Sequence, residues 1–120
     1  MRVLVTYYSR SGNTAAMARA ISQGAKEVKG TKVVIKTAER TSLKDLAESD
    51  AIIVGSPTYY GVMAAPVKKL IDESVDIHGK LEGKVGAAFT SSGGSATGAE
   101  TTMISILEAM LVHGMITQAN

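Results

Sequence analysis

The sequence predicts a doubly wound α/β fold around a mostly parallel sheet. Short apolar runs alternate with longer segments of helical periodicity along all 120 residues. No two runs are joined by a hairpin signal, so each strand is expected to reach the next through a right-handed crossover. The run of Ile52, Ile53 and Val54 is apolar without alternation, which is typical of a strand buried on both faces of a parallel sheet.

The first strand and the first helix follow from composition and spacing. Residues 2–8, rich in Val and Tyr, are expected to form a strand. Residues 15–28 show apolar side chains at helical spacing, and Gly30 marks the end of this helix. The predicted apolar face holds Met17, Ile21 and Val28 with Ala18 and Ala25 between them, and the polar face mostly holds Ser22, Gln23, Lys26 and Lys29.

The middle of the chain continues the alternation. A second strand is expected at residues 32–37, and a short helix at residues 42–48 begins after the capping residue Ser42. The buried run described above belongs to a third strand at residues 51–55. A loop at residues 56–65 follows it.

The last third of the chain supplies the remaining elements. A helix is expected from about Pro66, because proline is favoured in the first turn. A fourth strand at residues 84–89 leads into a polar, glycine-rich loop at residues 90–98. Residues 115–117 begin a fifth strand. The helix between them, at residues 99–113, is predicted to turn Met103, Ile106, Leu107, Met110 and Leu111 to one face.

The predicted elements fill one domain, residues 1–120, with a fifth strand that is short and no final helix after it. Three explanations stay open for the missing helix. The domain is minimal, or the chain is a C-terminally incomplete fragment or an engineered piece, or another chain completes the sheet.

Composition narrows the classes of function. The chain has no cysteine, which excludes disulfides and thiolate chemistry within it, and its His, Asp and Glu show no metal-ligand spacing. A net charge of +2 with scattered basic residues gives no indication of nucleic acid as a partner. Neither a signal peptide nor a membrane-length apolar run is present, so a cytoplasmic protein without membrane insertion is expected.

Three polar loops are expected at the carboxyl ends of strands, where open α/β sheets bind their ligands. The most informative runs Ser9-Arg10-Ser11-Gly12-Asn13-Thr14 and leads directly into a helix. A helix N-terminus offers unpaired N–H groups and a positive dipole end, so this loop suits a phosphate. It lacks the lysine of a phosphoryl-transfer loop and the three glycines of a dinucleotide loop. An ordinary capped turn remains the alternative, and Arg10 either neutralises a phosphate or points into water.

The loops together resemble a known family. The first loop looks like the phosphate loop of the flavodoxin-like proteins, which bind flavin mononucleotide (FMN). The second loop, Gly55-Ser56-Pro57-Thr58-Tyr59-Tyr60-Gly61, resembles that of the NAD(P)H:quinone oxidoreductases of the tryptophan-repressor-binding-protein type. The third loop from Phe89 to Gly94, with Glu100 and the later His113-Gly114-Met115, follows the same subgroup. The resemblance covers nearly all of the chain and implies the strand order 2-1-3-4-5.

The resemblance implies a role for each loop. The first would hold the phosphate, the second would lie along the isoalloxazine ring, and the third would contact its pyrimidine side and the ribityl chain. His113 would lie on the substrate side of the flavin, or reach a neighbouring subunit's site, although dipole stabilisation at a helix end is the plainer alternative. The cofactor-binding residues carried over are Ser9, Arg10, Ser11, Gly12, Asn13, Thr14, Pro57, Thr58, Tyr59, Tyr60, Gly61, Ser91, Ser92, Gly93 and Gly94.

Three functions are compatible with these features. The resemblance favours a two-electron oxidoreductase in which FMN takes hydride from NADH or NADPH and reduces a quinone, working as a homo-oligomer, a dimer or tetramer. A one-electron shuttle of the flavodoxin type is the alternative, although such shuttles are typically strongly acidic and this chain is not. The third is an inactive fragment or scaffold that keeps the fold. The natural acceptor, the choice between NADH and NADPH, the flavin potential and the oligomeric state are left open by the sequence.

Overall fold

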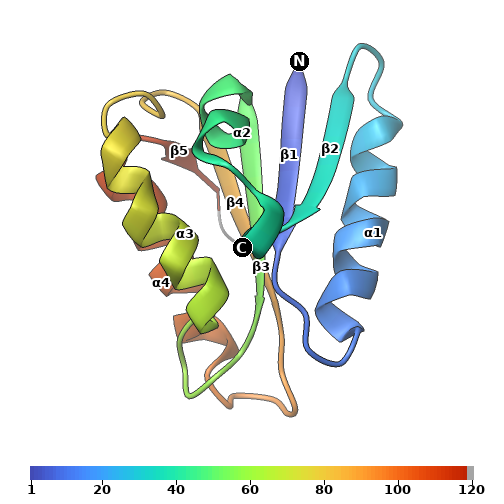
Figure 1. Ribbon diagram of the computed structural model, residues 1–120. Helices are drawn as coiled ribbons and strands as arrows, with labels where there is room; N and C mark the ends of the chain where they lie inside the picture. The colour runs from blue at the N-terminus through green and yellow to red at the C-terminus, as the bar shows by residue number, and fades with distance from the viewer. Residues whose placement is uncertain (119–120) are drawn as a thin grey trace.

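A computed structural model describes residues 1–118, which form a parallel five-stranded sheet with helices on both faces (Figure 1). The strand order β2-β1-β3-β4-β5 and the α/β class confirm the predicted fold. Every neighbouring pair of strands is parallel. The strands are β1 (Arg2–Tyr7), β2 (Lys32–Thr37), β3 (Ala51–Pro57), β4 (Val85–Ser91) and β5 (Ile116–Thr117).

The helices divide unequally between the two faces of the sheet. In Figure 1, α1 stands alone on one side, and α2, α3 and α4 stand on the other. The core is divided in the same way, into a larger apolar cluster on the side of the three helices and a smaller one under α1. The helices are α1 (Asn13–Lys26), α2 (Leu43–Glu48), α3 (Ala65–Glu73) and α4 (Ala99–Val112), with short 3₁₀ turns η1 (Ala38–Arg40) and η2 (Ser74–Ile77).

Two strands extend further than the sequence indicated. β3 and β4 each continue two residues past their expected ends, and Ser56 pairs with Thr90 while Pro57 pairs with Ser91. Polar residues therefore continue the ladder instead of starting loops. This extension fixes the beginnings of the second and third loops by backbone hydrogen bonds between the strands.

Three predictions about helix faces are wrong. Val28 lies beyond the end of α1 and is exposed, because the helix ends at Lys26. Ser22, expected on the polar face, is buried, and its hydroxyl donates to the carbonyl oxygen of Ala18 one turn earlier, which satisfies it without water. Leu111, expected to face inward, is exposed near the end of α4.

The fifth strand is short, as predicted, and pairs with β4 over two residues. On the face of the sheet that carries α1, Val85 of β4 and its partner Ile116 of β5 are both exposed. No helix among residues 1–118 is long and apolar enough to cross a membrane.

Candidate functional site

The carboxyl ends of β1, β3 and β4 carry the three polar loops, and an open hollow of about 330 Å³ lies between them. This volume is in the range of small-molecule and cofactor sites. Every residue of its lining was a predicted site residue. The lining consists of Arg10, Ser11, Asn13, Pro57, Thr58, Tyr59, Ser91, Ser92 and Gly93.

The first loop is held by Ser9. Its Oγ accepts the N–H of Gly12 at 3.1 Å and that of Ala15 at 3.2 Å, so this hydroxyl caps the first turn of α1. Gly12, which precedes the helix, has a φ of 99°, a backbone conformation that glycine adopts without penalty. The N–H groups of Asn13 and Thr14 have no hydrogen-bond partner within residues 1–118. An anion seated here would therefore meet free donors at a positive helix end.

A hydrogen bond ties the first loop to the third. The hydroxyl of Thr14, which is 2% exposed, lies 2.8 Å from the hydroxyl of Ser91 at the end of β4. Both were predicted to touch the cofactor. The hydroxyl of Thr14 is thus already engaged with Ser91, and its backbone N–H, which has no partner within residues 1–118, is its remaining donor.

The second loop is anchored by Ser56, which sequence reasoning did not select. This fully buried hydroxyl accepts the N–H of Ala64 at 2.8 Å and donates to the carbonyl of Pro57 at 2.8 Å. It thus joins the two ends of the loop. Thr58 adds bonds to β4, from its N–H to the carbonyl of Ser91 at 2.8 Å and between its hydroxyl and that of Thr90 at 2.8 Å.

The tip of the second loop is a two-residue turn. Tyr59 and Val62 exchange backbone hydrogen bonds at 3.2 Å in both directions, and the two residues between them have positive φ. Tyr60, at φ 51°, is in a region that non-glycine residues seldom enter, and its side chain is fully exposed. Tyr59 faces the hollow, whereas Tyr60 does not contribute to its lining. Of the two tyrosines predicted to form an aromatic wall, Tyr59 lines the hollow, and the contact of Tyr60 with a flavin stays a prediction.

The third loop meets the second, backbone against backbone. Gly98 has a φ of 102°, and a Cβ placed on it would lie 2.7 Å from the Cα of Gly61. A Cβ placed on Gly61 would in turn lie 3.0 Å from the hydroxyl oxygen of Thr101. Gly98 was missed by sequence reasoning, although it precedes a helix just as Gly12 does. The contact fixes how the two loops face each other across the hollow.

β3 and β4 approach each other closely just before the loops begin. A Cβ on Gly55 of β3 would lie 2.1 Å from the ring of Phe89 on β4, which is itself buried. The bare backbone of β3 thus makes room for an aromatic ring of the smaller core cluster, two residues before each strand ends. Arg10 is the one charged residue in the lining of the hollow.

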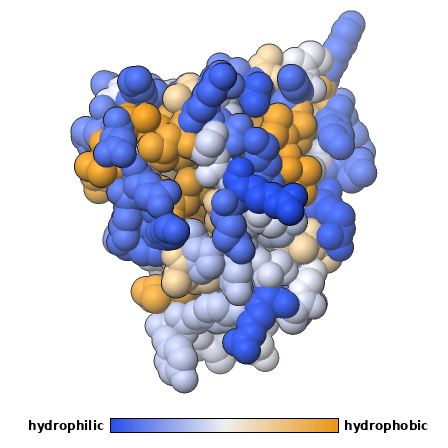
Figure 2. Space-filling model, in the orientation of Figure 1, coloured by the Kyte–Doolittle hydropathy of each residue, from blue (hydrophilic) through white to orange (hydrophobic). Residues whose placement is uncertain are grey.

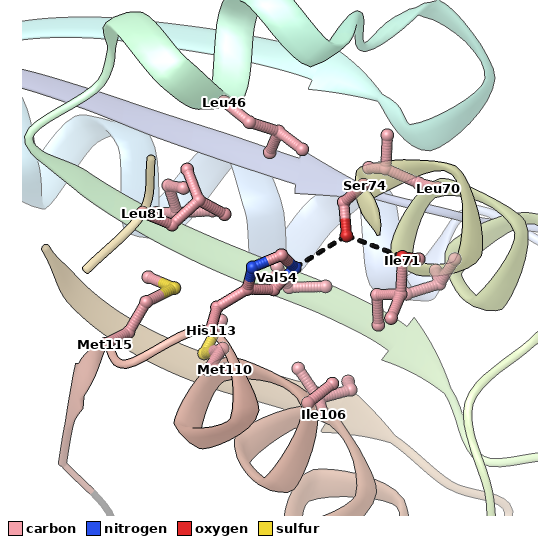
Figure 3. A pocket seen from close by; sticks show the side chains of 13 residues that line it. Leu46, Val54, Leu70, Ile71, Ser74, Leu81, Ile106, Met110, His113 and Met115 are labelled. Atoms are coloured by element: carbon pink, nitrogen blue, oxygen red, sulfur yellow. Dashed lines mark hydrogen bonds between the residues drawn. The ribbon is translucent and has the colours of Figure 1, made fainter. Parts of the chain in front are cut away.

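His113 lies elsewhere in this chain. It follows the last residue of α4, and the 14 residues of that helix place it about 21 Å along the axis from the third loop. Its Nε2 is 2.7 Å from the hydroxyl of Ser74 (Figure 3). Its ring lies 5.4 Å from that of His78. The hydroxyl of Ser74 donates its one hydrogen to the carbonyl oxygen of Ile71. The Nε2 of His113 is therefore the protonated ring nitrogen, and it donates a hydrogen bond to the oxygen of Ser74.

The Nδ1 of His113 is buried without a hydrogen-bond partner within residues 1–118. Burial, and to a lesser degree the neighbouring His78, lower the pKa of His113 below its ordinary value. The cavity beside this ring is apolar, measures about 40 Å³ and is lined mainly by core residues of α3, α4 and β3. That volume is far too small for a flavin, and the length of α4 separates His113 from the loop cluster of its own chain.

Comparison with known proteins identifies the family. The sequence profile described as NADPH-dependent FMN reductase matches residues 29–120. The chain belongs to the flavodoxin-like, FMN-binding family. It is 36% identical to a flavodoxin of Aquifex aeolicus, over 96% of this chain and 63% of that protein, and 36% identical to an NAD(P)H dehydrogenase (quinone) of Geotalea daltonii, over 97% and 69%. This flavodoxin-like chain thus spans somewhat less than two thirds of the Aquifex relative.

Solved structures agree with this family. A flavodoxin from the domain Archaea superposes with a TM-score of 0.87 at 39% identity, covering 100% of this chain and 80% of that one. A flavodoxin, WrbA-like protein from Agrobacterium tumefaciens gives a TM-score of 0.82 at 29% identity, covering 96% and 74%. The names flavodoxin and NAD(P)H dehydrogenase (quinone) therefore both occur among the relatives of this flavodoxin-like chain.

The site residues fit an FMN phosphate. The free N–H groups of Asn13 and Thr14 point out of a helix N-terminus that no acidic side chain occupies in its first turn. Arg10 and Ser11 in the lining add a positive charge and a hydroxyl at the same end of the hollow. A phosphate dianion would thus find donors without a nearby carboxylate.

Proposed function

We propose that this flavoprotein is a two-electron NAD(P)H:quinone oxidoreductase that holds FMN in the hollow between its three loops. The observation that carries the proposal is the lining itself, which is made of small, hydroxyl-bearing and aromatic residues from all three loops, with one cation. The bound flavin would supply the hydride chemistry. The chain supplies binding, orientation and electrostatics.

In this proposal the first loop binds the phosphate through the N–H groups of Asn13 and Thr14, with Ser9 holding the turn in shape. Tyr59 and Pro57 lie along the ring, where an aromatic contact contributes about 0.5–1.5 kcal/mol beyond burial. The third loop presents backbone groups to the polar edge of the ring. Its members in the proposal are Ser91, Ser92, Gly93 and Gly94.

The net charge of the chain favours the oxidoreductase over a shuttle. Shuttles of the flavodoxin type are typically strongly acidic, whereas this chain carries a formal charge of +2. Gly61, at φ 79°, carries no Cβ that opposes a turn of its peptide, and its carbonyl would be the acceptor for a hydrogen bond from a protonated flavin nitrogen. His113, 21 Å away by the length of α4, would act on a quinone only in the site of a neighbouring subunit of a homo-oligomer.

The one-electron shuttle is the second candidate, because relatives named flavodoxin are as similar as the named quinone dehydrogenase. A chain that has kept the fold and lost the flavin is the third. Under the first proposal the protein works in the cytoplasm, with NADH or NADPH as donor and a quinone as acceptor.

Anaerobic reduction distinguishes the candidates. The FMN-loaded protein is mixed with NADH or with NADPH, and the flavin absorption is followed. The oxidoreductase proposal expects bleaching of the oxidised flavin without a semiquinone band. No reaction with either nucleotide, together with a stable semiquinone on stepwise chemical reduction, would establish the shuttle instead.

A further inference from the structure

Charged residues are divided unevenly along the chain. Residues 1–40 hold eight Lys and Arg against two Glu, a formal charge of +6. Residues 41–120 hold five Lys against nine Asp and Glu, a formal charge of −4. The modest +2 of the whole chain therefore hides two segments of opposite sign.

The fold turns this division into two opposite sides of the molecule. Residues 1–40 build β1, α1, β2 and η1, and β2 is one outer strand of the sheet. The later, acidic segment builds β4, β5, α3 and α4, and β5 is the other outer strand. Figure 1 shows β2 and α1 together at one side of the molecule, with α3 and α4 at the other. We call the side formed by α1, β2 and η1 the basic face.

Part of the basic face is concave and lies at the cofactor edge of the sheet. An open groove of about 860 Å³ is lined by Tyr7 and Thr37, the last residues of β1 and β2, so it opens at the same edge as the three loops. Since neighbouring strands are about 4.8 Å apart, the end of β2 lies about 12 Å from the gap between β3 and β4. A partner seated in this groove would be close to a flavin held by the loops.

The groove presents positive charge that the protein does not neutralise. Arg19 from α1 and Arg40 from η1 are exposed, and neither forms an ion pair within residues 1–118. Lys36 also lines the groove, but its Nζ is 2.8 Å from a carboxylate oxygen of Asp45. Glu39 is the single acidic residue of the lining. The net positive charge thus rests on the two arginines.

We propose that the basic face docks an acidic redox protein, which exchanges electrons with the flavin that the proposed function places beside it. Electrons leave the reduced flavin for the oxidised centre of the partner, and the flavin protons leave to water. Complementary charge raises the rate of such encounters and orients them, without requiring a large apolar interface. The position beside the flavin loops favours a redox protein over a polynucleotide.

An inert paramagnetic anion tests the surface without requiring FMN. Hexacyanochromate(III) is added to ¹⁵N-labelled protein, with and without FMN, at 0.1 M salt, and amide line broadening is mapped. Broadening is expected around Arg19 and Arg40 and absent from α3 and α4, where the cation hexaamminechromium(III) should act instead. Arg40→Glu should reduce the broadening of the groove amides about threefold, the effect of two charge units on a trianion about 12 Å away at this salt.

Lys80→Glu is the matched control, since it changes the net charge equally and lies outside the basic face. An equal reduction of the groove broadening in the two variants, or broadening by the anion spread over α3 and α4, would overturn the proposal. Poly-L-glutamate is expected to displace the anion from the groove. Displacement by a short duplex DNA but not by poly-L-glutamate would overturn the assignment of an acidic protein. If FMN fails to bind while the anion maps to the groove, the proposed function falls and the docking surface stands.

Discussion

Gly98 and Gly61 bring two loops into backbone contact. A Cβ placed on Gly98 would lie only 2.7 Å from the Cα of Gly61. The second loop follows β3 and the third follows β4, so this contact joins two crossovers at the edge of the sheet. It sets the separation of the walls between which a flat ring would lie. Its role is testable by adding one carbon atom.

Gly98→Ala is expected to destabilise the fold and weaken FMN binding. The new methyl group would overlap backbone atoms that cannot move aside as a side chain does, and alanine at φ 102° is strained in addition. We expect a loss of about 2–4 kcal/mol in the free energy of unfolding. Urea unfolding and an FMN titration measure the two effects.

Gly24→Ala is the control for that variant. Gly24 lies inside α1 with open space around its Cβ direction and no positive φ. Alanine there should raise stability by about 0.5–1 kcal/mol and leave FMN affinity unchanged. A similar loss from both variants would show that the Gly98–Gly61 contact has no special role.

Ser56→Ala is expected to loosen the second loop. It leaves the buried N–H of Ala64 and the carbonyl of Pro57 without their shared hydroxyl, which costs about 1–3 kcal/mol of folding free energy. Amide exchange of Ala64 should accelerate along with the loss of stability. Ser95→Ala, in the exposed part of the third loop, should change neither quantity, and unchanged exchange at Ala64 in the Ser56 variant would refute the anchoring role.

Arg10→Gln is expected to weaken FMN more than riboflavin. If the guanidinium neutralises the phosphate, its removal should cost FMN affinity about tenfold and leave riboflavin affinity nearly unchanged. Fluorescence titrations with both flavins at low and high salt give the comparison. An equal loss for the two ligands would place Arg10 at the ring instead, and no loss would mean that it points into water.

The stability of the fold should decline as the pH falls below about 6.5, the ordinary pKa of histidine. Because the pKa of His113 is lowered in the folded state, mainly by burial, the unfolded chain binds the proton first, and the free energy of unfolding decreases with falling pH. The stability that the neutral His113 contributes is fully present above about pH 6.5 and is lost as the pH falls from there toward the lowered pKa of the folded state. Thermal melts between pH 5 and 8 measure the slope.

His113→Gln removes this titration while keeping a donor for Ser74. The slope of melting temperature against pH over that range should flatten in the variant. A slope equal to that of the unsubstituted protein would show that His113 does not titrate in the way its burial indicates.

Much of the site was predictable because its signals are local. Small polar residues after apolar runs mark the carboxyl ends of strands, and the glycine before α1 marks a helix start. Those two patterns marked the three loops, and the resemblance of the loops to the flavodoxin-like family supplied the individual residues, which include the whole lining of the hollow from Arg10 to Gly93. The position of Ser56 needed the knowledge that β3 continues through it, which the run Ile52–Val54 does not contain.

Other features depend on contacts between distant segments. The exposure of Tyr60 follows from a turn whose shape is set by the pairing of Tyr59 with Val62, and the need for glycine at residue 98 follows from the approach of residue 61. The distance of His113 from the loops was predictable from the length of the helix that precedes it. A 14-residue helix that starts at the cofactor edge of the sheet ends at the opposite edge. The two sides of opposite charge likewise needed the strand order, which places β2 and β5 at opposite edges.

An FMN titration of the ¹⁵N-labelled protein tests the central claim most directly. We expect one molecule of FMN per chain, with the largest shifts at the amides of Asn13 and Thr14 and further shifts at Tyr59 and Ser92. Those first two N–H groups are the free donors that the structure assigns to the phosphate. No binding at tens of micromolar FMN, an affinity of only about 6–7 kcal/mol, or shifts centred on His113 instead, would contradict the claim.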